Sequence, residues 1–155
     1  MSATLQPRIT VNTTYVPPTE PSLPALAVRT TQLVDSYMLW IGTADVPPEE
    51  VNNAPSQGCL SKDWACAMPA RDVSAHRHRE AFEEQNPWPC ALYRTPSSDA
   101  ALSMAQRLAR RFKKQIFLSI DVPPSIQTLG EAPKLLLAVE RAALTALKDA
   151  EGRAS

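Results

Sequence analysis

The sequence predicts an α+β fold in which two main helices pack on an antiparallel β-sheet, with the element order β-β-β-(β-β)-α-β-α. Three observations predict this class. The N-terminal part alternates apolar and polar residues, a short turn joins two further strand-like stretches, and the last third has the pattern helix, strand, helix. A chain of 155 residues is long enough for one hydrophobic core, so we expect a single domain over residues 1–155.

The N-terminal strands are predicted from alternation and from turn residues. Residues 7–16, PRITVNTTYV, alternate apolar and polar side chains until two prolines end the pattern. Residues 27–33 and 37–43 follow as two more strands, and residues 34–36, VDS, supply turn chemistry between them. These two strands are therefore expected to form a hairpin.

The middle of the chain, about residues 44–94, is a Pro-rich and insertion-like segment. Residues 44–58 read as a polar loop that prolines interrupt. Short strands are expected at residues 64–68 and 90–94, each followed by a nearby proline. Residues 71–86 have a helix-forming composition but a weak apolar stripe, so no element is assigned to them.

The last third has the clearest pattern. A helix capped by Ser97 or Ser98 is expected to run to the basic sequence RRFKK, with its apolar stripe at Leu102, Ala105, Ala109 and Phe112. Residues 115–122 then alternate as a strand that two prolines stop. A final helix is expected to begin near Pro133 and to run toward Gly152, with its stripe at Leu136, Val139, Ala143 and Leu147.

Composition excludes several classes of function. The formal net charge is zero, so we expect no nucleic-acid partner and no anionic membrane surface. The 4 glycines lie too far apart for a phosphate-binding loop. No apolar run has the length of a signal peptide or of a membrane span, which predicts a cytoplasmic or nuclear protein. The 3 cysteines suit reduced thiols better than a disulfide framework.

No pattern predicts catalysis, a metal or a cofactor. The potential zinc ligands are irregularly spaced, whereas structural zinc sites use close pairs; they are Cys59, Cys66, His76, His78 and Cys90. The acidic pairs at residues 49–50 and 83–84 are adjacent in sequence, as solvated surface charges are. Neither a nucleophile motif nor a paired base stands out, so we expect a protein that is not an enzyme.

The stretch LVDSYMLWIG, residues 33–42, poses a packing question. Tyr37, Leu39 and Ile41 would share one face of the strand and Met38 and Trp40 the other, but two helices can cover only one face. Either the Pro-rich middle segment folds over the second face, or a partner subunit covers it. Composition alone favours neither explanation.

A second question concerns the basic end of the first long helix, which carries Arg107, Arg110, Arg111, Lys113 and Lys114. These cations either complete the helix dipole as a solvated helix end or form a binding patch. If they bind, an acidic protein surface suits them better than nucleic acid, because no aromatic residues are interleaved as stacking platforms.

Two blocks of sequence together resemble the proteasome assembly chaperone 4 family. The first is LVDSYMLWIG at residues 33–42, and the second is MAQRLARRFKKQIFLSI at residues 104–120, followed by a closing Leu/Ala-rich helix. The resemblance covers somewhat under half of the chain. Residues 44–94 depart from the family pattern, in which a shorter segment joins the two blocks.

The resemblance implies a chaperone without enzymatic activity or cofactor. Such a protein forms a heterodimer with a proteasome assembly chaperone 3-like subunit, binds an α-subunit of the 20S core particle, chiefly α5, promotes correct α-ring formation and then dissociates. The residues expected to bind partners are Tyr37, Leu39, Trp40, Ile41, Phe117, Arg107, Arg110 and Arg111. The alternative function is a homodimeric domain that binds a small ligand and uses the sheet as the wall of its pocket.

Overall fold

A computed structural model describes residues 9–59, 62–69, 89–93, 99–123 and 130–154 of the chain. Its centre is a six-stranded sheet with the order β1-β2-β3-β6-β4-β5. In chain order the strands are β1 (Thr10–Val16), β2 (Leu26–Leu33), β3 (Ser36–Thr43), β4 (Trp64–Ala67), β5 (Pro89–Tyr93) and β6 (Gln115–Asp121). The two long helices are α2 (Ala100–Phe112) and α4 (Ala132–Ala154). The predicted α+β class is confirmed.

The sheet is antiparallel except at its centre. Strands β1, β2 and β3 form a meander, and β6, β4 and β5 pair antiparallel on the other side. Strands β3 and β6 run parallel, with Ser36 opposite Gln115 and Gly42 opposite Asp121. The prediction of an antiparallel sheet therefore holds for every pairing of the described strands but this one. The predicted hairpin is β2 and β3, and Asp35 takes a positive φ of 53° in the turn between them.

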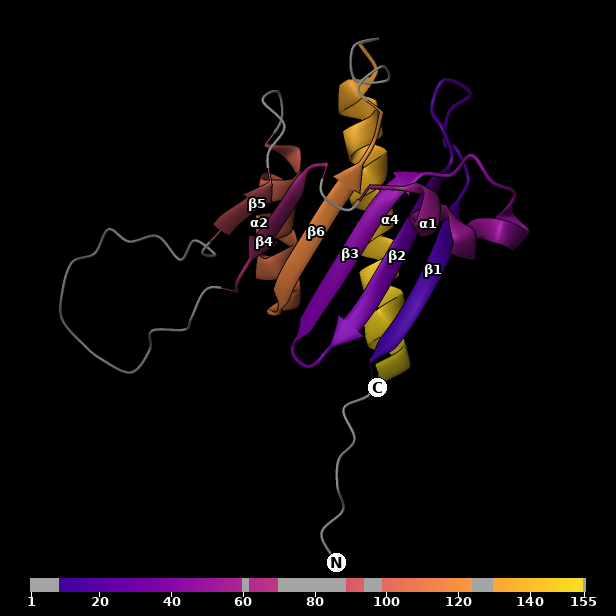
Figure 1. The fold of residues 1–155 in the computed structure, drawn as a ribbon. Coiled ribbons are helices and arrows are strands. Elements are labelled where there is room, and N and C mark those ends of the chain that lie inside the picture. The colour runs from indigo at the N-terminus through magenta and orange to yellow at the C-terminus, as the bar shows by residue number, and fades with distance from the viewer. Residues whose placement is uncertain (1–8, 60–61, 70–88, 94–98, 124–129, 155) are drawn as a thin grey trace, which may run out of the picture.

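Both long helices lie on one face of the sheet, behind it in Figure 1. Side chains from that face of β2, β3, β6 and β4 form one apolar core with α2 and α4, and Tyr37, Leu39 and Ile41 lie in it with 0% exposure. The apolar stripes of the helices have the predicted spacing but are wider than predicted. Leu102 and Leu136 are only partly buried, whereas Met104, Leu108 and Leu135 are fully buried.

The start of α2 differs from the prediction. Ser97 and Ser98, the predicted caps, lie outside the described residues, and the N-cap position is Asp99, whose side chain makes no capping hydrogen bond. Instead, the Asp63 carboxylate accepts the Ala101 N–H at 3.2 Å. A residue that precedes β4 therefore takes the role of the cap, because a carboxylate next to the first helical N–H groups satisfies them and favours the helix dipole.

The predicted loop over residues 44–58 is wrong in its local structure. It contains a 3-10 helix η1 (Pro48–Asn53) and a short helix α1 (Ala54–Gln57), and each has a proline at its start. Proline interrupts a helix interior but suits the first helical turn, where its fixed φ fits and its missing N–H is not needed. The segment predicted without structure at residues 71–86 lies outside the described residues.

The segment η1–α1 packs on the second face of the sheet, in front of it in Figure 1. Val51 and Ala54 form a small second core with Ala27 and Trp40, so that Trp40 is only 6% exposed. Of the two explanations for the second apolar face, cover by the Pro-rich middle segment is therefore the one that holds for Trp40. The ring of Trp40 passes so close to Gly42 and Gly58 that a Cβ there would lie 2.4 Å and 2.3 Å from its Cζ2 atom.

We predict that Gly42→Ala destabilises the protein by about 1–3 kcal/mol, because the new methyl group overlaps the Trp40 ring in a packed site. Gly152→Ala is the matched control. Nothing lies within 4 Å of a Cβ at Gly152, which sits in α4, so alanine there should leave stability unchanged or raise it by up to about 1 kcal/mol. Urea unfolding of both variants measures the difference, and equal stabilities would contradict the described position of Trp40.

Candidate partner-binding surface

The second face of the sheet is closed at one place and open next to it. Segment η1–α1 covers Trp40, but Met38, two residues earlier on the same face of β3, is only partly buried. Met38 lies opposite Phe117 of β6 in the parallel register, and Phe117 lies opposite Cys66 of β4. Of the described residues, these three place a row of apolar side chains across the centre of the sheet. We call Met38, Phe117 and Cys66 the central row.

Next to Met38 the surface is hollowed. A cavity of about 230 Å³ lies on the second face, lined by Arg29, Thr31, Met38, Trp40 and Pro55. The sheet forms its floor and α1 forms one wall, because Pro55 belongs to α1 while the other lining residues belong to β2 and β3. A side chain of a partner can enter such a hollow more easily than it can pack on a flat sheet.

The cover of the second face is anchored by the end of β6. Asp121 is only 8% exposed, and its carboxylate accepts the backbone N–H of Cys59 and binds the Lys62 ammonium at 2.9 Å. These contacts hold the chain that follows α1 against β6. A buried carboxylate needs such donors, since an unpaired charge away from water is costly. The boundary between the covered and the open part of the face is therefore fixed by hydrogen bonds as well as by packing.

The structure separates the predicted partner-binding residues into groups. Tyr37, Leu39 and Ile41 are enclosed by the helices, with no exposed surface through which to contact a partner. Trp40 lies under η1–α1 but also lines the 230 Å³ hollow. Phe117 lies in the central row and is partly exposed. Met38 is not among the predicted partner-binding residues, although its alternation with Tyr37 and Leu39 already places it on the second face, beside Trp40.

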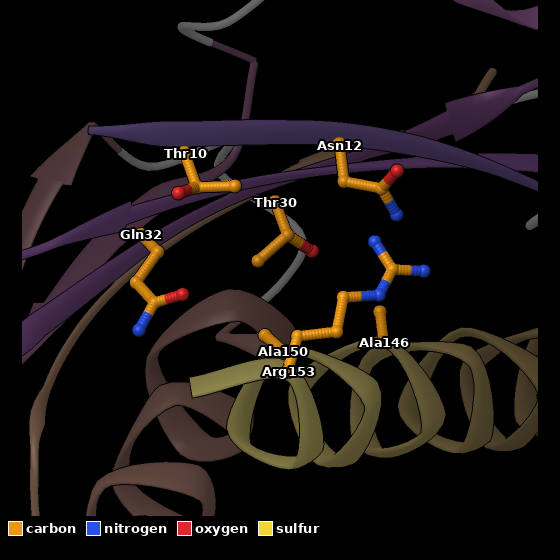
Figure 2. Close-up of a pocket in the computed structure, with 7 residues that line it drawn as sticks. All are labelled: Thr10, Asn12, Thr30, Gln32, Ala146, Ala150 and Arg153. Atoms are coloured by element: carbon orange, nitrogen blue, oxygen red, sulfur yellow. The ribbon is translucent and has the colours of Figure 1, made fainter. Parts of the chain in front are cut away.

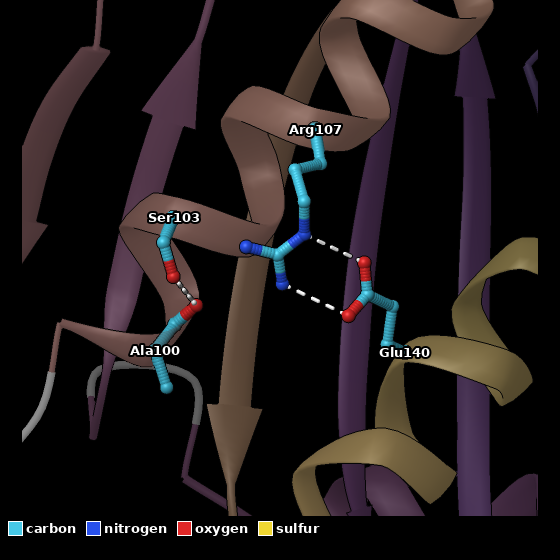
Figure 3. A network of polar contacts seen from close by, with 4 residues as sticks. All are labelled: Ala100, Ser103, Arg107 and Glu140. Carbon is cyan, nitrogen blue, oxygen red and sulfur yellow. Dashed lines mark hydrogen bonds and ion pairs between the residues drawn. The ribbon is translucent and has the colours of Figure 1, made fainter.

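The basic end of α2 is partly used within the domain. The Arg107 guanidinium binds the Glu140 carboxylate of α4 through two hydrogen bonds, of 2.7 and 2.9 Å (Figure 3). The hydrogen bond from Arg107 holds the pKa of Glu140 below its usual value, against the opposing effect of partial burial. A two-point contact of this kind fixes the relative position of two helices. Arg107 therefore joins α2 to α4.

Lys114 also forms its contacts within the domain, with Tyr37 and Glu151. Its Nζ donates to the Tyr37 hydroxyl at 3.0 Å, lies 4.7 Å from the centre of that ring and 3.6 Å from the Glu151 carboxylate. The hydrogen bond with Tyr37 is the main cause that raises the pKa of Lys114. Arg110 and Arg111 remain in the last turn of α2 and are exposed. Lys113, the C-cap residue of α2, is exposed as well, so Arg110, Arg111 and Lys113 form the exposed part of the predicted basic cluster.

Two absences hold for the described part of the chain. No group of three or more His, Cys, Asp or Glu side chains is arranged to hold a metal ion, and His76, His78 and the Cys90 side chain lie outside the described residues and side chains. None of the helices described for this chain is both long and apolar enough to cross a bilayer.

Comparison with known proteins identifies the family. The model of the family "Proteasome assembly chaperone 4" matches residues 25–122, which is more than half of the chain. The chain belongs to the proteasome assembly chaperone 4 family. Proteasome assembly is therefore the role that its family indicates. No curated protein matches the chain in sequence.

A solved structure has the same fold as this member of the proteasome assembly chaperone 4 family. It is a chain of the "Crystal Structure of a Novel Chaperone Complex for Yeast 20S Proteasome Assembly", with a TM-score of 0.57 and 17% sequence identity. The match covers 91% of this chain and 96% of the yeast chain. At this identity the likeness concerns the fold. The family match runs from just before β2 to just after β6, so it includes the central row and its cover.

We predict that the ion pair of Arg107 and Glu140 stabilises the fold by about 0.5 kcal/mol, since both side chains are partly in water. A cycle of Arg107→Gln, Glu140→Gln and the double variant, measured by urea unfolding, isolates this coupling energy. Because the folded-state pKa of Glu140 is lowered, the coupling should be complete above the ordinary glutamate pKa and should disappear as the pH falls through the lowered value. Coupling that is absent at pH 7, or that grows on acidification, would contradict this account.

Proposed function

We propose that this chain is the smaller subunit of a heterodimeric chaperone, paired with a proteasome assembly chaperone 3-like subunit, that binds the α5 subunit of the 20S core particle. In this proposal the heterodimer promotes correct α-ring formation and dissociates before the particle matures, in the cytoplasm or nucleus. The observation that carries the proposal is the central row, in which Met38 and Phe117 stay partly exposed beside a covered tryptophan, in a chain of the proteasome assembly chaperone 4 family.

The energetics favour a protein partner over solvent at this surface. Burial of a large apolar side chain such as Met38 or Phe117 contributes roughly 1.5–3 kcal/mol. Contiguous apolar residues on a sheet face that has polar residues at its margin are typical of protein interfaces. Arg29 and Thr31 supply such a margin next to Met38, and the hollow between them offers a seat for one side chain of the partner. The yeast structure is a chaperone complex, which agrees with a paired subunit.

Arg110 and Arg111 support the second contact of the proposal. They lie on the helix layer, whereas the central row lies on the opposite face of the sheet, so one side of the domain can hold the partner subunit while the other meets the α-subunit. A pair of exposed guanidinium groups at the end of α2 suits an acidic protein surface. The two binding events can therefore be separated by mutation.

We predict that the double variant Met38→Asp and Phe117→Asp abolishes formation of the heterodimer, because two carboxylates at the centre of the contact would be buried without partners. Leu137→Asp is the matched control, since Leu137 is a large apolar residue of α4 that is already 50% exposed. Co-expression with the partner subunit followed by affinity purification measures the complex, and circular dichroism checks that the variants fold. A double variant that still forms the heterodimer would overturn this interface.

We predict that Arg110→Glu together with Arg111→Glu weakens capture of α5 by tenfold or more at physiological salt and leaves the heterodimer intact, because the charge reversal changes only the helix end. The measurement is a pull-down of α-ring intermediates from cell extract with identification of the co-purifying subunits. The control is Lys148→Glu, which reverses the charge of an exposed cation on the other long helix, α4. Unchanged capture by the double variant would show that this helix end is only a solvated terminus.

A further inference from the structure

A polar cavity lies on the helix side of the sheet, away from the central row. It has a volume of about 570 Å³ and lies between strands β1 and β2 and the last turns of α4 (Figure 2). Its lining residues are Thr10, Asn12, Thr30, Gln32, Ala146, Ala150 and Arg153. This volume is typical of sites for small molecules.

The cavity exists because the side chains of β1 and β2 that face α4 change from apolar to polar along the strands. At one end of the register, Leu26 and Val28 of β2 belong to the apolar core under α4. At the other end the positions that face the helix are Thr30 and Gln32, next to Thr10 and Asn12 of β1. Opposite them α4 presents the short side chains of Ala146 and Ala150, with Arg153 in its last turn. The strands and the helix therefore leave space there that apolar side chains do not fill.

The lining contains one polar atom that has no partner among the described residues. Thr30 is only 4% exposed, and its Oγ1 atom makes no hydrogen bond with the part of the chain that the structure describes. A buried hydroxyl without a partner is unfavourable, by an amount comparable with a lost hydrogen bond. Figure 2 shows the Thr30 hydroxyl on the side of the Arg153 guanidinium, with the Asn12 amide beside the same guanidinium. Three groups that can donate hydrogen bonds thus line one cavity, and Asn12 already uses one amide N–H in a hydrogen bond with the Thr14 hydroxyl at 3.1 Å.

The charge of the lining defines the ligand. Arg153 is the one charged lining residue among those that the structure describes, and its planar guanidinium can bind a carboxylate through two parallel hydrogen bonds. The hydroxyl and amide groups of the other polar lining residues can each donate and accept. The free carbonyl groups at the C-terminal end of α4 carry partial negative charge, which disfavours a ligand that offers only a negative charge. A ligand must therefore also form hydrogen bonds with the neutral hydroxyl and amide groups of the lining. A carboxylate on Arg153 with further hydroxyl or carbonyl groups toward the strands meets both conditions.

We propose that this cavity binds a small polar carboxylic acid, with its carboxylate on Arg153 and a further oxygen in a hydrogen bond with Thr30. The carboxylate comes either from a free hydroxy acid or from the acidic end of a peptide. This site is independent of the heterodimer and of α5 capture, since none of its residues belongs to the central row or to the end of α2.

The test is calorimetric titration of the full chain with two probes, citrate and a hexapeptide that ends in two glutamates. At least one probe should bind, and Arg153→Gln should weaken that binding by tenfold or more. Lys148→Gln, which removes an exposed cation outside the cavity, should bind the probe as the parent chain does. Binding of citrate assigns the site to a free acid, and binding of the peptide alone assigns it to a chain terminus.

Thr30→Val separates a binding role from a structural one. Valine has the same shape as threonine and suits a strand equally well, so removal of the hydroxyl without a partner should leave the midpoint of thermal unfolding unchanged or raise it. The same variant should lower the affinity for the probe. The proposal is overturned if neither probe binds, or if Arg153→Gln and Thr30→Val bind as tightly as the parent chain.

Discussion

The parallel pairing of β3 and β6 holds the domain together. These two strands lie at the centre of the six-stranded sheet, and the register from Ser36 opposite Gln115 to Gly42 opposite Asp121 joins the two halves of the chain. Parallel neighbours need a long crossover, and here the crossover contains η1, α1, β4, β5 and α2. Every element that covers either face therefore depends on this one pairing.

The two faces of this strand pair are buried to different extents. On one face, Leu39 lies opposite Leu118 and Ile41 opposite Ile120, and both long helices bury these side chains. On the other face, the segment η1–α1 is the cover that the described residues provide, and it reaches Trp40 but leaves Met38 and Phe117 partly exposed. The open surface proposed to bind a partner thus lies on a sheet that is apolar on both sides, where the described part of the chain covers one face fully and the other in part.

The predictable parts of the fold are those that depend on local pattern. Alternation located β2, β3 and β6, and helical spacing located α2 and α4, because each of these elements buries one face against the same core. The parallel direction of β6 could not be predicted, since a strand has the same alternation in either direction. The Asp63 cap and the ion pair of Arg107 with Glu140 join residues 38 and 33 positions apart, a distance that no local pattern encodes.

The candidate site, too, was predictable from local pattern only in part. The period-2 pattern of residues 37–41 predicted that one face of the strand would need cover, and this was sufficient to find the surface. Which residues remain open depended on where Val51 and Ala54 pack, and the prolines that start η1 and α1 made that segment read as a loop. Tyr37, Leu39 and Ile41 were selected for their apolar character, although it is the same character that places them in the core.

The most direct test of the central claim is site-specific photo-crosslinking from the central row in cells. A photoreactive phenylalanine analogue at position 117 should crosslink to one partner protein, in a complex that contains proteasome α-subunits, while the same analogue at position 137 on the outer side of α4 should not crosslink to that partner. Crosslinks from position 137 but none from position 117 would contradict the claim that the open face of the sheet is the partner-binding surface.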